Sequence, residues 1–137
     1  MSGETDLTLL LRTMSPVVRE SEYVFCVVPH ASPPTASTLH TFKPLCTFRE
    51  EEGLTLVLTR AQADAAGVRY DAVFRCVTLA VQSSLVAVGF LAAVTHVLAE
   101  RGIPVNPVSA FYHDHLFVPA DRVDDALAAL RALADGT

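Results

Sequence analysis

Apolar and polar positions in the first third of the chain predict a short helix followed by a strand. DLTLLLRTM (6–14) can form a helix with Asp6 as its N-cap, and Pro16 prevents the helix from continuing, although the alternation of Thr and Leu also allows a strand. EYVFCVV (22–28) is β-branched and aromatic, which is typical of a strand. Three prolines with serines and threonines then predict a surface loop over residues 29–38.

The next segment reads as a hairpin and a second short helix. PLCTFREEEGLTLVLT (44–59) has two apolar stretches around an acidic turn, in which Gly53 can supply a positive φ. Residues 60–66 are predicted as a helix that ends at Gly67.

The second half has a clearer pattern. AVFRCVTLAV (72–81) is predicted as a strand, and residues 83–102 as a helix with Ser83 or Ser84 as N-cap and Gly102 just beyond its end. The first part of this helix is apolar on every side, so we expect it to be buried on every side, by the sheet and by the other half or a second subunit. Its apolar positions are Leu85, Val86, Ala87, Val88, Phe90 and Leu91. His96 and Glu100, spaced i to i+4, mark a solvated face near its end.

Two further strands and a last helix complete the pattern. The strands are predicted over 103–113 and 115–119, and Asp121 is expected to cap the helix, with Asp124 and Asp125 in its first turn. The core face of that helix recurs at helical spacing: Val123, Leu127, Leu130 and Ala134.

From residue 72 the element order is therefore β-α-β-β-α, which lacks only the last strand of a ferredoxin-like β-α-β-β-α-β unit. A sheet without that strand would expose an edge beside its first strand. The strand at 22–28 or the one at 54–59 can fill the gap. We therefore predict an α+β fold of two interlocked halves, 1–70 and 71–137, with antiparallel sheets and helices on one face, neither half folding alone.

Composition narrows the class of protein. A chain of 137 residues with 51% hydrophobic residues can bury a proper core. The net charge is −5 and the ten basic residues are scattered, which argues against binding to nucleic acid. Cys26, Cys46 and Cys76 have no CxxC spacing, as expected of reduced, buried thiols in a cytoplasmic protein. The most apolar run (85–94) is shorter than the roughly 20 residues that span a bilayer, and no targeting pattern begins the chain, so no membrane association is expected.

The HDH motif is the most conspicuous candidate for chemistry. In a strand, His113 and His115 share one face with Phe111 and Phe117, and Asp114 points to the other. A metal site needs a third ligand. The other histidines are distant in the sequence: His30, His40 and His96. We interpret HDH as a strand connection near a ligand or subunit interface, with a small metal-dependent enzyme as the alternative. No nucleophilic triad, P-loop or G-x-G-x-x-G pattern is present.

The turn QSSLVAVG (82–89) is the strongest candidate for ligand binding. It is expected to join a strand to a helix N-terminus, where free N–H groups and the helix dipole favour an anion such as a carboxylate. Gln82, Ser83 and Ser84 offer polar groups, and Gly89 allows close approach. The plainer interpretation is that the serines cap the helix and Gly89 serves helix packing.

Two other polar features can contribute to a site. Asn106, between two prolines, can both donate to and accept from a bound α-amino acid, or it can simply stabilise a turn. Glu51 and Glu52, beside Glu50, crowd carboxylates in one turn, which suits either a solvated turn or capture of a ligand's amino or guanidinium group.

The run SSLVAVGFLAAVTHVLAERGIPVNPVSAFYHDHLFV (83–118) resembles an ACT domain, a module that senses small molecules in amino-acid metabolism. The chain is most similar to a bacterial group that contains REEEGLTLV and HDHLFVP, over residues 7–130. The pattern S-L-x-A-V-G, L-A-x-x-G-I and N-x-V-S also resembles the paired ACT domains of arginine sensors and aspartate kinases. Two departures from the family pattern are expected: no strand follows the last helix, and no catalytic domain is attached.

The resemblance implies a βαββαβ fold and a ligand near residues 82–89, and in several ACT domains the position that matches Asn106 touches the ligand. It places His113 and Asp114 at a tight connection between strands. We therefore expect a regulatory module without catalysis or cofactor, which binds an amino acid or related metabolite at an ACT–ACT interface. It would form a homodimer and regulate an enzyme in trans. The alternative from another class is a scaffold that only dimerises or docks.

Overall fold

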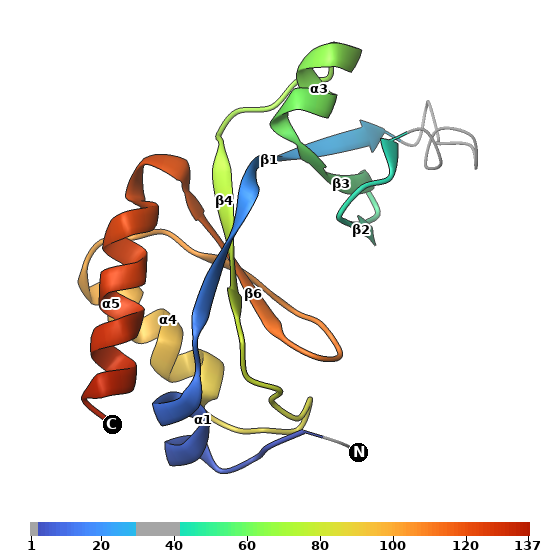
Figure 1. Cartoon of the computed structure of the whole chain (residues 1–137). Helices are drawn as coiled ribbons and strands as arrows, with labels where there is room; N and C mark the ends of the chain where they lie inside the picture. Colours follow the sequence, from blue (N-terminus) through green and yellow to red (C-terminus); the bar gives the residue numbers. More distant parts are fainter. Residues whose placement is uncertain (1–2, 30–41) are drawn as a thin grey trace. The chain divides into compact units, whose positions relative to one another are not determined.

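The computed structural model describes residues 3–29 and 42–137, which form two compact units (Figure 1). The first unit comprises Met1–Glu20 and Arg75–Thr137, and the second comprises Ser21–Phe74. The long strand β1 (Pro16–Pro29) begins in the first unit and ends in the second. The mixed α+β architecture confirms the predicted fold class. Most of the loop predicted over 29–38 lies outside the described residues.

Unit 1 is a sheet with helices on one face. Its strands follow the order β1-β4-β6-β5, and β5 and β6 are antiparallel. Its other elements are α1 (Leu7–Thr13), β4 (Phe74–Leu79), α4 (Phe90–Glu100), β5 (Asn106–Ser109), β6 (Asp114–Pro119), the 3-10 turn η1 (Ala120–Arg122) and α5 (Val123–Asp135).

Alternation along the strands builds the core of unit 1. Every second residue of β4 and β6 packs into one apolar cluster with the three helices. Its fully buried members include Leu10, Val77, Leu79, Val94, Leu98, Leu116, Val118 and Leu130. The predicted core face of α5 is confirmed, because Leu130 is fully buried and Val123, Leu127 and Ala134 pack against the same cluster.

The strand beside β4 is β1, so the earlier of the two candidate strands takes this position. The backbone N–H of Ala80 donates to the Ser15 carbonyl at 2.8 Å. Further along, the guanidinium of Arg75 donates to the Arg19 carbonyl at 2.7 Å. β1 starts at Pro16, six residues before the predicted strand at 22–28. The first residues of β1, up to Glu20, belong to unit 1.

Unit 2 is a three-stranded antiparallel sheet with one short helix. The strand order is β2 (Cys46–Arg49), β3 (Gly53–Thr59) and β1, and α3 (Arg60–Ala66) follows directly. Its core contains Val24, Cys26, Leu56, Leu58 and Ala63. The predicted hairpin and the predicted end of α3 at Gly67 are confirmed, with Gly67 in the left-handed region at φ 67°. Cys26 and Cys76 are buried free thiols as expected, whereas Cys46 is only half-buried.

The role expected of Gly53 is wrong. Gly53 is not among the residues with positive φ; it is the first residue of β3 and pairs with Pro29. A Cβ at this position would lie 2.7 Å from the carbonyl oxygen of Val28. Glycine is therefore required here by the close approach of β1 and not by turn geometry.

The start predicted for the long helix is also wrong. α4 begins at Phe90, and its N-cap is Gly89 at φ 93° instead of Ser83 or Ser84. The Ser84 hydroxyl accepts a hydrogen bond from the Val86 N–H at 3.2 Å, so it stabilises a turn before the helix. Three apolar side chains of the preceding loop are exposed in the protomer, with Leu85 51%, Val86 64% and Val88 84% exposed, so the sheet does not bury them and their burial by a second subunit stays a prediction. The predicted end is confirmed, with Gly102 at φ 67° and His96 paired with Glu100 at 3.2 Å.

The last helix begins differently from the prediction. Asp121 lies in η1, and the N-cap of α5 is Arg122, without a side-chain cap. The Arg122 guanidinium contacts Asp125 at 3.0 Å, so the first-turn carboxylate is used as an ion-pair partner. The strand predicted over 103–113 is shorter, because the N–H of Ala110 donates to the His113 carbonyl at 3.0 Å and closes a turn between β5 and β6. The strand predicted over 115–119 begins one residue earlier, at Asp114. None of the helices in the described ranges is long and apolar enough to cross a membrane.

Candidate ligand-binding site

A pocket of about 170 Å³ opens in unit 1 where the loop before α4 meets the β5–β6 hairpin. Its volume is below the range of about 300–1,000 Å³ that is usual for drug-sized ligands, so it suits a small molecule. The lining residues are Ser83, Ser84, Leu85, Ala87, Phe90, Leu91, Ser109, Ala110 and Asp114. We call this space the serine pocket.

A buried carboxylate forms one side of the serine pocket. Asp114 is only 7% exposed, because β6 places it on the same face as Leu116 and Val118, towards the helices. Ser109 Oγ donates to Asp114 Oδ1 at 2.6 Å, and Ser83 Oγ donates to Oδ2 at 3.3 Å. These hydroxyls offset part of the cost of taking the carboxylate out of water. The lone pairs that remain on its oxygens can accept from a ligand.

The N-terminus of α4 forms another side. Gly89 provides no side-chain cap, and Phe90 and Leu91 in the first turn line the serine pocket. The first backbone N–H groups of a helix have no intrahelical acceptor, and the helix dipole adds a partial positive charge there. An anionic group is therefore favoured beside this turn. The serine pocket thus offers donors at one side and a carboxylate at another.

The N-terminal segment holds the loop that lines the serine pocket. The N–H of Glu4 donates to the Gln82 carbonyl, and the N–H of Ser84 donates to the Glu4 carbonyl, both at 2.9 Å. Gly3 has a φ of 109°, and a Cβ there would lie 2.7 Å from the Ser84 nitrogen. This close parallel contact fixes the backbone that presents Ser83 and Ser84.

The structure brings together only some of the residues predicted for the site. Ser83, Ser84 and Asp114 line the serine pocket. Gly89 adjoins it as the N-cap of α4, and the Gln82 carbonyl binds Glu4.

The remaining candidates lie elsewhere. Asn106 is an exposed residue at the start of β5, paired with Phe117, and His113 ends the hairpin turn. Neither lines the serine pocket. Glu51 and Glu52 belong to unit 2, in the exposed turn between β2 and β3. A ligand role for these four residues stays a prediction.

Ser109 is the polar residue that sequence reasoning missed. It pairs directly with Asp114 in the antiparallel register of β5 and β6, so the two side chains share a face. The sequence signal that could have identified Ser109 is its position five residues before Asp114, across a predicted hairpin. The strand predicted over 103–113 included the residues that form the turn, and Asp114 was placed in the connection, so the pairing of Ser109 with Asp114 was not predicted.

The HDH motif divides between the two faces of the sheet. Asp114 is the first residue of β6 and not part of the connection, which corrects that expectation, and Phe111 is 56% exposed in the turn instead of packed beside the histidines. His115 is half-buried, and its Nδ1 is 2.9 Å from Thr78 Oγ1. Burial lowers the pKa of His115. No group of three His, Cys, Asp or Glu side chains within residues 3–29 and 42–137 is arranged to hold a metal ion.

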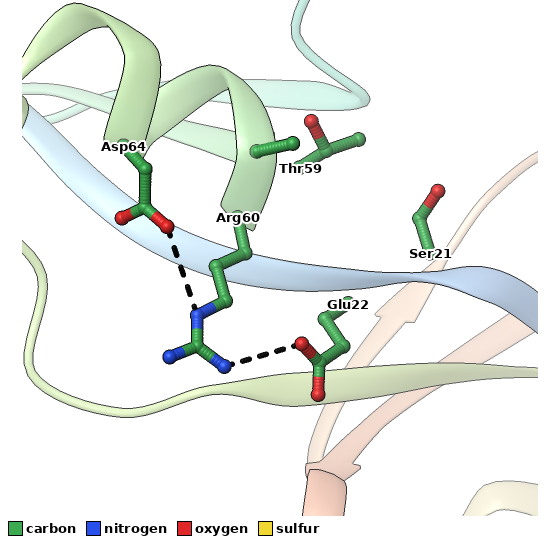
Figure 2. A pocket seen from close by; sticks show the side chains of 6 residues that line it. Ser21, Glu22, Thr59, Arg60 and Asp64 are labelled. Atoms are coloured by element: carbon green, nitrogen blue, oxygen red, sulfur yellow. Dashed lines mark hydrogen bonds and ion pairs between the residues drawn. The ribbon is translucent and has the colours of Figure 1, made fainter.

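A second, larger pocket of about 360 Å³ lies in unit 2 (Figure 2). Figure 2 shows Arg60 reaching between Glu22 and Asp64, with nitrogen to oxygen distances of 3.2 and 3.9 Å. Tyr70 donates to the Asp64 carboxylate at 2.6 Å. Because the Arg60 guanidinium is already paired with two carboxylates of the protein, we consider this pocket a weaker candidate for ligand binding than the serine pocket.

Comparisons with known proteins place both parts of the chain in one family. An ACT domain profile matches residues 2–75, and a second ACT domain profile matches residues 71–132. None of the curated proteins compared with the chain matches it significantly.

Solved structures agree with these matches. A protein of unknown function from Vibrio cholerae, described as a possible transport protein, is 44% identical, with 97% of this chain and 99% of that chain covered and a TM-score of 0.83. A protein from Agrobacterium tumefaciens is 17% identical, with 88% and 89% covered and a TM-score of 0.72. The regulatory subunit of aspartate kinase from Thermus flavus is 9% identical, with 86% and 95% covered and a TM-score of 0.64. The last two share the fold. The tandem profile matches, one of which covers more than half of the sequence, show that this chain belongs to the ACT domain family.

Proposed function

We propose that this protein is a regulatory module that senses a small amino acid or a closely related metabolite in the serine pocket. The ligand's carboxylate would lie at the N-terminus of α4, and its ammonium group would bind Asp114. The protein performs no catalysis of its own and acts on an enzyme in trans.

The observation that carries this proposal is the pairing of opposite recognition elements in one small space. Uncapped N–H groups of α4 favour an anion, and the Asp114 carboxylate, oriented by Ser109 and Ser83, favours a cation. A zwitterion satisfies both at once, whereas a simple anion would be repelled by Asp114. The small volume of 170 Å³ favours a short side chain on the ligand.

Exposed apolar residues support a subunit interface beside the serine pocket. Leu85, Val86 and Val88 are exposed in the loop that lines it, and Phe111 and Tyr112 are 56% and 62% exposed in the adjoining hairpin turn. Exposed apolar surface around a polar site is typical of an interface. We propose that a second copy covers this surface and closes the site. The same observation favours the alternative function, a scaffold that dimerises or docks on a partner without a ligand.

A thermal-shift screen of the twenty amino acids tests the proposal. A ligand at 100 times its dissociation constant adds about 2.7 kcal/mol to the free energy of unfolding, which raises the melting temperature by several degrees. Asp114→Asn should abolish the shift because it removes the negative charge that binds the ammonium group. Glu52→Gln in unit 2 tests the ligand role predicted for the acidic turn, and it should leave the shift unchanged if the ligand binds in the serine pocket.

The outcomes separate the candidate functions. A shift with one or a few amino acids that Asp114→Asn removes supports the sensor. A dimer that responds to no amino acid supports the scaffold. Purified protein that carries about one zinc, nickel or manganese ion per chain, lost on replacing His113 and His115 together by Asn, would move the metal-dependent enzyme to first place.

A further inference from the structure

The face of the unit 1 sheet opposite the helices carries a group of basic side chains. Val18 packs into the helical core, so alternation puts Arg19 of β1 on the opposite face. The same argument places Thr78 of β4 there, because Val77 and Leu79 are core residues, and His115 of β6, because Leu116 and Val118 are core residues. His113 precedes β6, with its ring centroid 6.4 Å from that of His115.

Arg19 contributes a guanidinium to this group, and no described residue pairs with it. Arg19 is exposed on β1, and its side chain makes no hydrogen bond or ion pair with any residue of the described ranges. Its backbone is held instead, because Arg75 donates from Nε and Nη2 to the Arg19 carbonyl at 3.3 and 2.7 Å. A guanidinium presents paired N–H donors that match the two oxygens of a carboxylate or phosphate.

The two histidines extend the donor set. The Thr78 hydroxyl engages Nδ1 of His115 at 2.9 Å, which orients the ring and leaves Nε2 for another partner. Burial, then the positive charges of Arg19 and His113, lower the pKa of His115, and the charge of Asp114 acts in the opposite sense. Asp114 itself is buried on the other face with Ser109 and Ser83. None of the described residues that alternation puts on this face of β1, β4 and β6 in unit 1 is acidic, so the basic groups repel one another without a carboxylate between them.

We propose that the face formed by Arg19, Thr78, His113 and His115 binds a small molecule through an oxyanion, either a phosphate or a carboxylate group. Arg19 supplies two N–H donors to the oxyanion, and the imidazoles of His113 and His115 supply further N–H donors. The bound negative charge offsets the repulsion between the three basic groups. This site is distinct from the serine pocket, because the sheet separates the two faces.

A histidine titration by NMR tests this proposal on the whole chain. Inorganic phosphate, and in a separate arm acetate, is added at constant ionic strength maintained with chloride. We expect saturable shifts of the His113 and His115 ring signals and a raised pKa for His115, because the anion favours its protonated imidazole. Saturation by phosphate alone identifies a phosphate group as the ligand chemistry, and saturation by both anions identifies a general oxyanion site.

Two arginine variants make the test specific. Arg19→Gln should weaken the apparent affinity for phosphate by about tenfold, since a hydrogen bond to a charged group contributes about one decade or more. Without anion, this variant should raise the pKa of His115, because a repelling charge is removed. Arg131→Gln on the exposed face of α5 is the control and should bind phosphate as the wild type does. An unsaturable response, or equal binding by Arg19→Gln and Arg131→Gln, overturns the proposal.

Discussion

Ser109 donates a 2.6 Å hydrogen bond to Asp114 across the antiparallel pair of β5 and β6. This bond holds a carboxylate that is 7% exposed in the wall of a small pocket. The register of one hairpin therefore orients the acceptor that we propose for a ligand's ammonium group. Because this carboxylate is buried, losing the hydroxyls that donate to it should also lower the stability of the hairpin.

Replacing Ser109 by Ala should lower the free energy of unfolding by about 1–3 kcal/mol, because a buried carboxylate loses its shortest hydrogen bond. Urea denaturation measures the loss. Ser21→Ala, at an exposed position of β1, is the control and should stay within about 0.5 kcal/mol of the wild type. A loss in Ser109→Ala no larger than in the control would show that Asp114 does not depend on this donor.

Val88→Glu should convert the proposed dimer to a monomer and leave the fold intact. Val88 is 84% exposed in the protomer, so a charge there has no folding cost, but it would be buried unpaired in an interface. Sedimentation at micromolar concentration measures the change. Val27→Glu, at a 59% exposed position in unit 2, is the control and should remain dimeric. A wild-type monomer, or a dimeric Val88→Glu, contradicts the interface.

Gly89→Ala should destabilise the protein by about 1–2 kcal/mol, because a residue with a Cβ is strained at a φ of 93°. The added Cβ would also approach Leu7 Cδ2 at 3.2 Å. Comparing Gly89→Ala in the wild-type background and in Leu7→Ala separates the two causes. If Leu7→Ala abolishes the whole loss, crowding and not backbone strain explains the glycine.

Stability should fall as the pH falls through about 6.5, and His115 should contribute to the loss. In the folded protein, burial and then the charges of Arg19 and His113 lower the pKa of His115, and the charge of Asp114 acts in the opposite sense. In the unfolded chain, the histidine side chain has a pKa of about 6.5. Between the two pKa values the unfolded state binds more protons, so the contribution is fully present above the unfolded pKa and is lost towards the folded one.

Urea denaturation at pH 7.5 and pH 5.0 measures this pH dependence. His115→Asn should lose less stability than the wild type between the two conditions. His96→Asn, on the exposed face of α4, serves as control. If His115→Asn loses as much stability between pH 7.5 and pH 5.0 as the wild type does, His115 is not a source of the pH dependence.

Local signals predicted those parts of the fold that depend on near neighbours. Asp6 accepts from the Leu9 N–H at 3.0 Å as the N-cap of α1, and Gly67 ends α3 in the left-handed region. In both cases the contacts that fix the end of the helix join residues only a few positions apart in the chain, so the local sequence predicts them. The element order also indicated that a strand of the first half lies beside β4, but it left open which of the two candidate strands does so.

The parts that could not be predicted depend on distant contacts. Ser84 stabilises a turn instead of capping α4 because its N–H is taken by Glu4, some eighty positions earlier in the chain. Ser109 joins the candidate site only through the register of the β5–β6 hairpin, which apolar alternation did not fix, because the first strand was predicted too long and Asp114 was placed in the connection. The sequence therefore indicated the loop and Asp114 but not the pocket that they form together.

The most direct test of the proposed function is to map the backbone amide shifts by NMR while titrating the amino acid that gives the largest thermal shift. We predict that the largest saturable shifts fall on Ser84, Phe90, Leu91 and Ser109, and that Asp114→Asn abolishes them. Shifts centred on Arg60 and Asp64 in unit 2, or no saturable shift with any of the twenty amino acids, would contradict the account.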